Sequence, residues 1–457
     1  MKICYAFLLL LWVTYSYAQY PSPTKKFSAQ QQRDDLAFLE KQLFDAHANP
    51  YTELSKQQYE QFFDSVRSQI KDSADVTTFY KLIKPAFAHL SDEHSAVSID
   101  PAQLTSTYKT GAVFLPITLL EHGNDYTIGQ LLSASTTLKP GDKIVAIDRE
   151  PITLLVKRCA AYTTGYPGQR HNNALAQFGY LYTWAAEKPE IHYTITTADG
   201  KTTTIDGTDL QTWRSYLNAN NGMEPCDQMI SYTRYNNAGY IKACSFMTHS
   251  NKQYDSLKTC IDGIFRHIKS DGIKYLFIDV SKNGGGNSQV GDVLIDYIYS
   301  KPYLGYQCNW RRSDEYLKLI TKWGITDSNY IAHAPGSVLH FDAYKNVPST
   351  QNASRFNGKV YVIIGNGTFS SAMMFATVIK DNHIATLIGQ TPQNGHPDHF
   401  GELYNSELPN TKLSFRFGVK EWIRPAGKQS DNYLKPDEVI DPNTNSNPQQ
   451  LIEAATK

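Results

Sequence analysis

Several features are missing from this sequence of 457 residues, and each absence excludes a class of protein. After the first residues, no stretch approaches the roughly 20 apolar residues that a membrane-spanning helix needs. Neither sign of charge dominates, because 44 Lys and Arg residues balance 44 Asp and Glu residues. A nucleic-acid partner or an anionic membrane surface favours a basic surplus. We therefore expect a protein with no membrane span and no nucleic-acid partner.

Cysteine is scarce, and none of its spacings is typical of a metal site. We accordingly predict no metal and no other cofactor. Six cysteines occur in all, and five of them follow residue 18, which allows at most two disulfides and leaves at least one thiol over. These five are Cys159, Cys226, Cys244, Cys260 and Cys308.

The N-terminus has the pattern of a signal peptide. Met1-Lys2 is followed by the apolar run Ile3–Val13 and then by Ser16-Tyr17-Ala18, which is a small-residue cleavage site. We assign residues 1–18 to this signal and expect the mature chain to begin at Gln19. The protein is thus predicted to be exported, either to the periplasm or out of the cell.

Two regions of different character follow the signal. Apolar residues recur at helical spacing up to Leu90, which predicts a helical domain over residues 19–105. Pro85 interrupts the last predicted helix and favours a kink or a break there. Residues 106–207 instead contain short β-like runs that glycine and proline punctuate.

One stretch of the β-like region resembles the centre of a PDZ domain. Leu138–Asp148, followed by Pro151-Ile152, is similar to the strand-turn-strand of that fold. PDZ domains bind an extended peptide by adding it as a strand to an exposed sheet edge. We interpret residues 106–207 as a PDZ-like, β-rich domain. The alternative is a PDZ-like fold whose groove is lost or filled.

Strands and helices alternate in the last region, residues 208–457. This alternation predicts an α/β fold around a largely buried sheet. An insert rich in Tyr and Trp, at about residues 301–354, interrupts the pattern. The predicted strands are 239–246, 274–280, 359–364 and 384–388, and the predicted helices are 252–268, 289–299 and 370–380.

A glycine-rich loop follows one of these strands. Asp279–Gly286 ends in three consecutive glycines, and the helix expected at 289–299 comes directly after it. Glycine permits backbone conformations closed to other residues and lets N–H groups approach a ligand closely. Such a turn can donate hydrogen bonds to a developing oxyanion. The alternatives are a plain connector or a phosphate-binding loop, although the GxxxxGK[ST] pattern is absent.

A second loop places serine at the start of a helix. Gly367–Met373 lies between the predicted strand 359–364 and the helix that follows. A serine at the first helical turn exposes its hydroxyl where backbone N–H groups and the helix dipole favour negative charge. The alternative for Ser370 or Ser371 is an ordinary helix cap. The presence of both loops in one α/β region favours catalysis.

Taken together, the loops resemble a known family of hydrolases. Phe277–Gly286 is similar to the aspartate-leucine-arginine-glycine-asparagine-triple-glycine signature of the tail-specific (C-terminal processing) and tricorn-core serine peptidases. Asn366–Ala376 is similar to their nucleophile segment, and Leu434–Asp437 to their late proline-aspartate element. The resemblance implies an α/β, ClpP/crotonase-like peptidase core behind a helical and a PDZ-like domain. It also implies a serine endopeptidase that acts on peptides or unfolded protein tails.

The resemblance assigns roles to residues of both loops. Ser370 falls on the nucleophile, and Ser371 is the fallback. The backbone N–H groups of Ser371 and of Gly284 or Gly285 fall on the oxyanion hole. One branch of the family uses a lysine about 25 residues after the serine, but that position is Gly395 here. A Ser-Lys dyad is therefore not expected.

A histidine is the predicted base instead. Leu90-Ser-Asp-Glu-His94 resembles the leucine-x-aspartate-x-histidine turn of the tricorn-like branch. Imidazole has an ordinary pKa of about 6.5, which suits hydrolysis near neutral pH. Without the family resemblance, His94 is more simply a solvated histidine in a turn. His399 and His396 are the competing bases, and they could also be metal ligands, although no fourth ligand suggests itself.

Three positions depart from the family pattern. Met373 stands where the family usually has glutamate, and Ser281-Lys282 replaces the usual arginine and glycine. The orienting acid of the tricorn-like branch has no clear counterpart, and Asp431 is the nearest candidate for this third catalytic residue. The alternative function is therefore an inactive peptidase homologue that binds peptides. Oligomeric state and cleavage specificity are not predicted.

Overall fold

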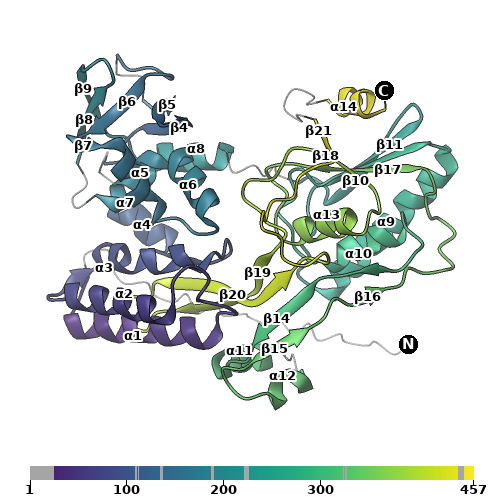
Figure 1. Ribbon diagram of the computed structural model, residues 1–457, viewed down its shortest axis with the longest axis horizontal. Helices are drawn as coiled ribbons and strands as arrows, with labels where there is room; N and C mark the ends of the chain where they lie inside the picture. Colours follow the sequence, from purple (N-terminus) through teal and green to yellow (C-terminus); the bar gives the residue numbers. More distant parts are fainter. Residues whose placement is uncertain are drawn as a thin grey trace, which may run out of the picture.

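A six-stranded sheet organises the C-terminal half of the chain in the computed structural model (Figure 1). The structure describes residues 25–108, 111, 113–133, 137–186, 190–220, 226–322, 324, 327–440 and 447–456, so the predicted signal peptide lies outside the described residues. The strand order is β10-β11-β12-β17-β18-β21, and only β10 and β11 pair antiparallel. The strands are β10 (Ile230–Tyr235), β11 (Ala238–Ala243), β12 (Tyr275–Asp279), β17 (Lys359–Ile364), β18 (Thr386–Gly389) and β21 (Glu438–Val439).

Helices cover both faces of this sheet. On one face, α9 (Asn251–Asp271), α10 (Gln289–Asp296) and α13 (Ser371–Asp381) share a hydrophobic core with alternate residues of the strands. On the other face, α14 (Pro448–Ala455) packs against the remaining strand residues. A strand that is buried on both faces is apolar throughout rather than alternating. This explains the continuous apolar character of β12 and confirms the predicted α/β class.

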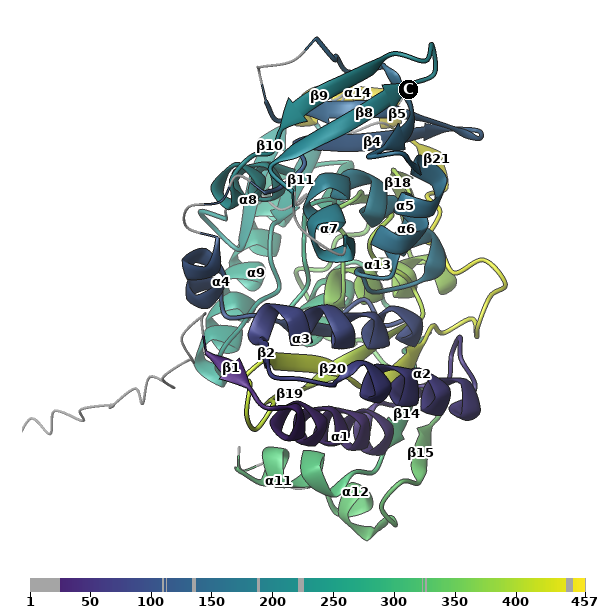
Figure 2. The same ribbon diagram turned by 90° about the vertical axis from the view of Figure 1, so that its left-hand side faces the viewer.

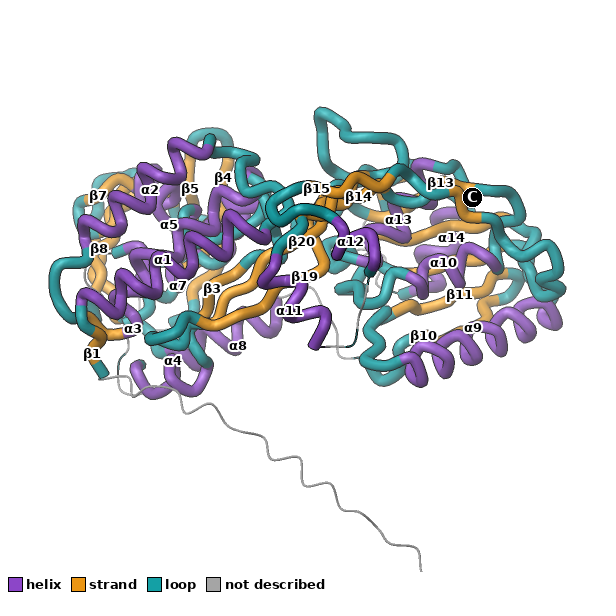
Figure 3. The backbone as a smooth tube through the Cα atoms, turned by 90° about the horizontal axis from the view of Figure 1, so that it is seen from below, coloured by secondary structure: helices purple, strands orange, loops and turns teal. Residues whose placement is uncertain are grey.

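A second, antiparallel sheet joins the N-terminal region to the C-terminal half of the chain. Its order is β15-β14-β20-β19, and β3 also pairs with β20. Figure 3 shows β19 and β20 running from the N-terminal helices towards the α/β core. The strands are β3 (Ala96–Ser98), β14 (Gln307–Arg311), β15 (Val338–Phe341), β19 (His399–Glu407) and β20 (Ser414–Ile423).

The N-terminal helices pack on this second sheet. In Figure 2, α1 (Ala29–Ala46), α2 (Lys56–Gln69) and α3 (Val76–Ile83) lie beside β20. Their buried residues form one core with β19 and β20 and with aromatic residues of the predicted insert, such as Trp310 and Tyr330. The helical region therefore has no separate core of its own. The insert contributes β14, β15, α11 (Asp314–Lys322) and α12 (Ser328–Ala332), together with β13 (Tyr303–Leu304) and β16 (Lys345–Asn346).

Pro85 changes the helix type, as the sequence predicts. The α-helix α3 ends at Ile83, and η1 (Lys84–Leu90) continues as a 3-10 helix with the proline in its first turn. A proline at that position lacks only an N–H group that is unsatisfied in any case. Ser91, in a left-handed conformation with φ 48°, then ends the helix and starts the turn that carries His94.

A third sheet lies beside the N-terminal helices and is antiparallel, in the order β4-β5-β6-β8-β9 with β7 beside β6. Helices α5 (Ile152–Ala160), α6 (Pro167–Ala176) and α7 (Phe178–Ala185) share its core. Among the described residues, no helix has the length and apolar character that a membrane crossing requires. The strands are β4 (Ile117–His122), β5 (Asp125–Leu131), β6 (Lys143–Ile147), β7 (Glu150–Pro151), β8 (His192–Thr197) and β9 (Thr202–Asp206).

Candidate active site

Ser370 occupies a sharp turn between β17 and α13. Its backbone has φ 50° and ψ −123°, a conformation that non-glycine residues rarely adopt. Strain of this kind persists only where surrounding structure imposes it, and it concentrates at functional sites. A strand-turn-helix elbow with this conformation presents the serine hydroxyl above the edge of the sheet. The Ser370 residue is partly exposed, whereas Ser371 is buried.

Hydrogen bonds connect the serine segment, residues 367–371, to the glycine loop, residues 279–286. The two loops leave neighbouring parallel strands, β12 and β17, at the same edge of the sheet. Serine-segment donors reach carbonyl oxygens of residues 280–286 at distances of 2.6 to 3.0 Å. The bonds run from Gly367 N to Ser281 O, from Thr368 Oγ1 to Val280 O, from Phe369 N to Asn283 O and from Ser371 Oγ to Gly286 O.

Gly285 approaches the serine so closely that no side chain fits. Its φ is +94°, and a Cβ atom there would lie 2.8 Å from both Ser370 Cβ and Ser371 N. The N–H group of Gly285 donates to Asn283 Oδ1 at 2.8 Å, so it is occupied in this conformation. Within the described chain, the N–H groups of Gly284 and Ser371 donate to no protein acceptor. Of the amides that the sequence suggested, these two are free to bind an oxyanion.

His94 lies next to the serine segment, and His399 lies next to His94. The ring centroid of His94 is 4.7 Å from that of Phe369, the residue before Ser370, and 5.9 Å from that of His399. The fold thus brings together the turn after η1, the start of β19 and the serine elbow. Across the described residues, no hydrogen bond joins the Ser370 hydroxyl to either histidine.

Asp92 is the carboxylate nearest to His94. Its Oδ1 accepts the backbone N–H of His94 at 2.8 Å and lies 3.9 Å from the His94 Nδ1 atom, while its Oδ2 accepts the N–H of Gly418 at 2.8 Å. Burial of this carboxyl alone would raise its pKa. The hydrogen bond and charge of His47, the charge of His94 and the Gly418 amide outweigh burial and hold the pKa of Asp92 below its usual value. Asp92 lies within the predicted histidine motif, but it was not predicted as a partner of His94.

His399 has a fixed tautomer. Its Nδ1 lies 3.1 Å from the carbonyl oxygens of both His396 and Pro397, so Nδ1 carries the proton and Nε2 the lone pair. Burial, reinforced by the charge of His94, lowers the pKa of His399 to about 4. The imidazole of His399 is consequently neutral at pH 7.

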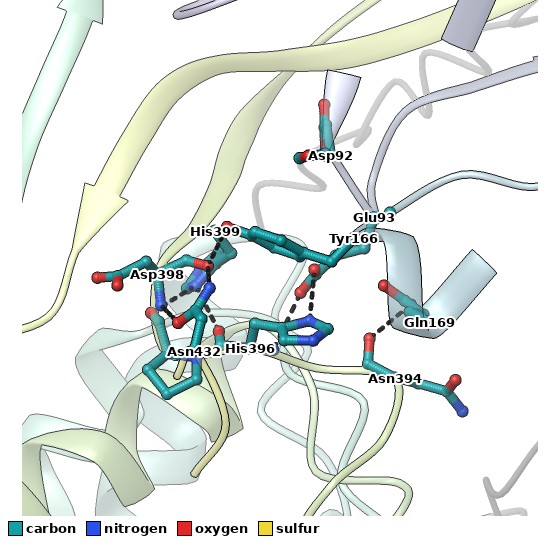
Figure 4. A network of polar contacts seen from close by, with 12 residues as sticks. Asp92, Glu93, Tyr166, Gln169, Asn394, His396, Asp398, His399 and Asn432 are labelled. Carbon is teal, nitrogen blue, oxygen red and sulfur yellow. Dashed lines mark hydrogen bonds and ion pairs between the residues drawn. The ribbon is translucent and has the colours of Figure 1, made fainter. Parts of the chain in front are cut away.

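His396 pairs with Glu93. Figure 4 shows the Glu93 carboxylate directed at the His396 ring, with Nδ1 to Oε2 at 3.0 Å. The residue before His396 is Gly395, where a Cβ atom would lie 2.7 Å from Thr368 O. A lysine at this position would collide with the serine segment, which agrees with the expected absence of a Ser-Lys dyad.

Asp431 has a different partner from the one predicted. Its exposed carboxylate pairs with Lys435 at 2.5 Å, and no described contact links it to His94 or His399. The prediction of Asp431 as the third catalytic residue is corrected accordingly, because the late loop places this side chain in solvent. The carboxylate beside His94 is that of Asp92. Among the described residues, no group of three His, Cys, Asp or Glu side chains is arranged to hold a metal ion.

One disulfide lies close to the core sheet. Cys226 bonds to Cys244, which directly follows β11. The remaining described cysteines are free thiols, with Cys159 and Cys308 buried and Cys260 exposed. This pattern agrees with the expected limit of two disulfides and with at least one thiol left over.

Comparisons with known proteins agree with this arrangement. Residues 237–440 match the model of peptidase family S41. The structure of mature CPAF is similar over 93% of this chain and 95% of its own, with 15% sequence identity and a TM-score of 0.57. Mature CPAF complexed with lactacystin covers 93% and 97% at 15% identity, with a TM-score of 0.56.

A third solved structure has a lower TM-score. The photosystem II D1 C-terminal processing protease covers 91% of this chain and 93% of its own at 14% identity, with a TM-score of 0.43. No curated protein sequence matches the chain. The structural likeness to mature CPAF shows a shared fold over nearly the whole of both chains.

Proposed function

Because residues 237–440 match the model of peptidase family S41, we propose that the protein is a serine endopeptidase with a Ser-His mechanism. Ser370 is the nucleophile and His94 the general base, as in the tricorn-like branch that the sequence resembles. The substrates are peptides or unfolded protein tails. The observation that carries the proposal is the strained backbone of Ser370. The glycine loop packs directly against this residue, and the rings of Phe369 and His94 are in contact beside it.

The first step is attack on the peptide carbonyl carbon. A serine hydroxyl is a weak nucleophile until a neighbouring base removes its proton. As the Oγ–C bond forms, His94 accepts the Ser370 proton and becomes a cation. The buried carboxylate of Asp92, 3.9 Å from His94 Nδ1, is placed to stabilise that cation. Since Ser370 and His94 are not hydrogen-bonded here, the contact has to tighten when substrate binds, as is common for catalytic pairs.

The negative charge that develops on the carbonyl oxygen needs donors. The N–H groups of Ser371 and Gly284 are the unoccupied amides at the elbow, and Ser371 is the first residue of α13. A helix N-terminus adds favourable dipole charge at that point. Loss of one oxyanion donor typically costs about 10²- to 10³-fold in kcat. The requirement for a close amide explains why the triple glycine faces the serine.

The cycle closes through an acyl-enzyme. His94 returns the proton to the leaving amine as the C–N bond breaks, which leaves the acyl group on Ser370 Oγ. A water molecule then gives a proton to His94 as its oxygen attacks the ester carbonyl. His94 passes that proton to Ser370 Oγ as the Oγ–C bond breaks, which releases the carboxylic acid product and restores the free serine. No redox change and no cofactor enters this balance.

His399 serves as a neutral neighbour in this proposal. A histidine with a pKa of about 4 is a much weaker base than an ordinary imidazole at about 6.5. Because its ring stays uncharged, the positive charge that forms on His94, 5.9 Å away between ring centroids, meets no like charge there. This difference favours His94 over His399 as the base.

The remaining expectations extend the proposal. We propose that residues 106–207 guide the substrate as a PDZ-like domain, with β4 as an edge strand where a peptide could add. The ion pair of His171 with Glu121, 2.7 Å apart, links α6 to β4. We also propose export, which the Cys226–Cys244 disulfide supports, because disulfides persist in oxidising compartments.

A peptide-hydrolysis assay tests the proposal. Purified chain without residues 1–18 is incubated with a quenched fluorescent unfolded protein, and Ser370→Ala is expected to abolish cleavage. Ser371→Ala is the matched control, because it keeps the Ser371 N–H and should retain activity. Cleavage that survives in Ser370→Ala, or that stops only in Ser371→Ala, would overturn the assignment. Peptide binding without any cleavage by the unaltered protein would favour the inactive homologue.

A further inference from the structure

Glu93 and His396 form a buried acid-histidine pair beside the candidate site. The His396 ring donates from Nδ1 to Glu93 Oε2 at 3.0 Å, and the His396 backbone N–H donates to Glu93 Oε1 at 3.2 Å. Both carboxylate oxygens of one residue are therefore used by the other. The residues are 303 positions apart in the sequence, so the contact exists only in the folded chain (Figure 4).

The pair is enclosed on every side that the structure describes. Each of the two side chains is only 1% exposed. The centroid of the His396 ring lies 4.4 Å from that of Tyr166 and 5.0 Å from that of Tyr433, which prevents the ring from turning. Desolvation offsets much of the attraction within a buried ion pair, so stability alone is a weak reason for such a pair to exist. Fixing the position of chain segments is the better-attested use.

Glu93 is linked to His94, and His396 is linked to His399. Glu93 directly precedes His94 in the turn after η1. The carbonyl oxygen of His396 is one of the two acceptors that hold the His399 Nδ1–H at 3.1 Å. A shift at Glu93 would therefore move His94, and a shift at His396 would move the ring of His399.

The backbone around His396 depends on side chains from elsewhere. The segment 394–398 has no regular secondary structure. Gln169 Nε2 donates to the carbonyl oxygen of Asn394 at 2.9 Å, and the Tyr166 hydroxyl donates to that of Asp398 at 2.8 Å. Of these contacts, only the Glu93 pair connects the segment to the turn that carries His94.

We propose that Glu93 and His396 are positioning residues that hold His94 and His399 at the Ser370 elbow. This inference rests on the proposed function, since it assigns the pair a task within that site. Neither residue is catalytic, because His396 Nε2 is buried without a hydrogen-bond partner among the described residues and does not reach the serine. The pair acts through the histidines that it positions.

Three variants separate positioning from mere packing. In Glu93→Gln, an NH2 group replaces one of the two carboxylate oxygens, so one of the two His396 donors faces a donor in place of its acceptor. In His396→Leu the ring donor is lost. In His396→Asn, a side-chain N–H replaces Nδ1–H as donor to Glu93. We expect Glu93→Gln and His396→Leu to lower kcat about 10- to 100-fold with KM nearly unchanged, as small misplacements do, and His396→Asn to recover most of that loss.

A matched control accounts for the loss of a buried charge. The Asp35 carboxylate is also buried and accepts the backbone N–H groups of Asn410 and Thr411, each at 2.8 Å, at the far end of the β19–β20 hairpin. Asp35→Asn should lower the melting temperature while kcat stays unchanged. All kinetic values are measured below the melting temperature of each variant.

The outcomes are distinct. If Glu93→Gln retains kcat within about twofold while folded, or if His396→Asn is as impaired as His396→Leu, the positioning role is refuted. Should His396→Leu fail to fold, the comparison of Glu93→Gln with His396→Asn decides alone. An unaltered protein that does not cleave peptides refutes the proposed function itself, which is a different result from an active protein with unaffected variants.

Discussion

At the scale of single residues, catalysis is proposed to depend on one strained serine and on the different states of two histidines. Ser370 has a backbone conformation that costs free energy, and the hydrogen bonds between its segment and the glycine loop impose it. His399 is neutral and donates from Nδ1 to backbone carbonyls. His94 lies beside an ionised and buried Asp92. This difference between the surroundings of the two histidines favours His94 as the residue that transfers the proton.

Single histidine variants test that assignment. His94→Ala should lower kcat/KM by about 10²- to 10⁴-fold, the usual contribution of a general base. His399→Ala should cost less than about tenfold, because a group with a pKa of about 4 takes little part in proton transfer at pH 7. Steady-state kinetics on folded protein, checked by thermal unfolding, measures both effects. A larger loss for His399→Ala than for His94→Ala would reverse the roles.

The local residues of the site could be predicted, but their partners could not. Ser370, the triple glycine and His94 stand in short contiguous motifs, and the fold brings these motifs together. Asp92 lies only two positions before His94, but its contacts with His47 and with the amide of Gly418, which is 326 positions away, exist only in the folded chain. Asp431 lies in the predicted stretch of sequence before the proline-aspartate element, yet its loop places it in solvent beside Lys435. Side-chain partners of this kind are set by tertiary packing.

At the scale of elements, buried strands could be predicted better than exposed ones. The strand predicted at 359–364 is observed as Lys359–Ile364, because an apolar run covered on both faces gives a clear signal. No strand was predicted for β19 (His399–Glu407) or β20 (Ser414–Ile423), where polar and apolar residues mix. Their pairing depends on the N-terminal helices and on β14, which no local pattern reveals.

One ion-pair cluster links elements near the His94 turn. Glu53 accepts hydrogen bonds from Arg170 of α6 at 2.6 and 2.8 Å and from Ser91 at 2.7 Å. Burial of Glu53 would raise its pKa, but hydrogen bonds from His89, Arg170 and Ser91 and the charge of Arg170 lower it to about 2. The unfolded chain titrates near an ordinary pKa of about 4.3. The cluster therefore stabilises the fold fully above that value and loses its contribution as pH falls towards 2.

Glu53→Gln should remove this contribution. We expect the variant to lose roughly 1 to 3 kcal/mol of unfolding free energy at pH 7. The gap in melting temperature between variant and unaltered protein should then narrow as pH is lowered from about 5 to 3. Calorimetry across that range measures the gap. A gap that stays constant with pH would show that Glu53 stabilises the fold by packing rather than by its charge.

At the scale of the whole molecule, the candidate site is shared between distant parts of the chain. His94 comes from the N-terminal region, Ser370 and the triple glycine from the α/β core, and His396 from a segment that α6 also contacts. The α/β class could be predicted from the alternation of strands and helices along the sequence. The shared core of the N-terminal helices with β19, β20 and the aromatic insert could not, because it joins residues that are hundreds of positions apart.

Covalent labelling tests the central claim most directly. A fluorophosphonate reacts fastest with a serine whose hydroxyl is activated by a base next to an oxyanion hole. After incubation and proteolytic digestion, mass spectrometry should find the adduct on Ser370 of the unaltered protein, and labelling should become far slower in His94→Ala. An adduct on another residue, or no adduct on folded protein that is otherwise intact, would contradict the account.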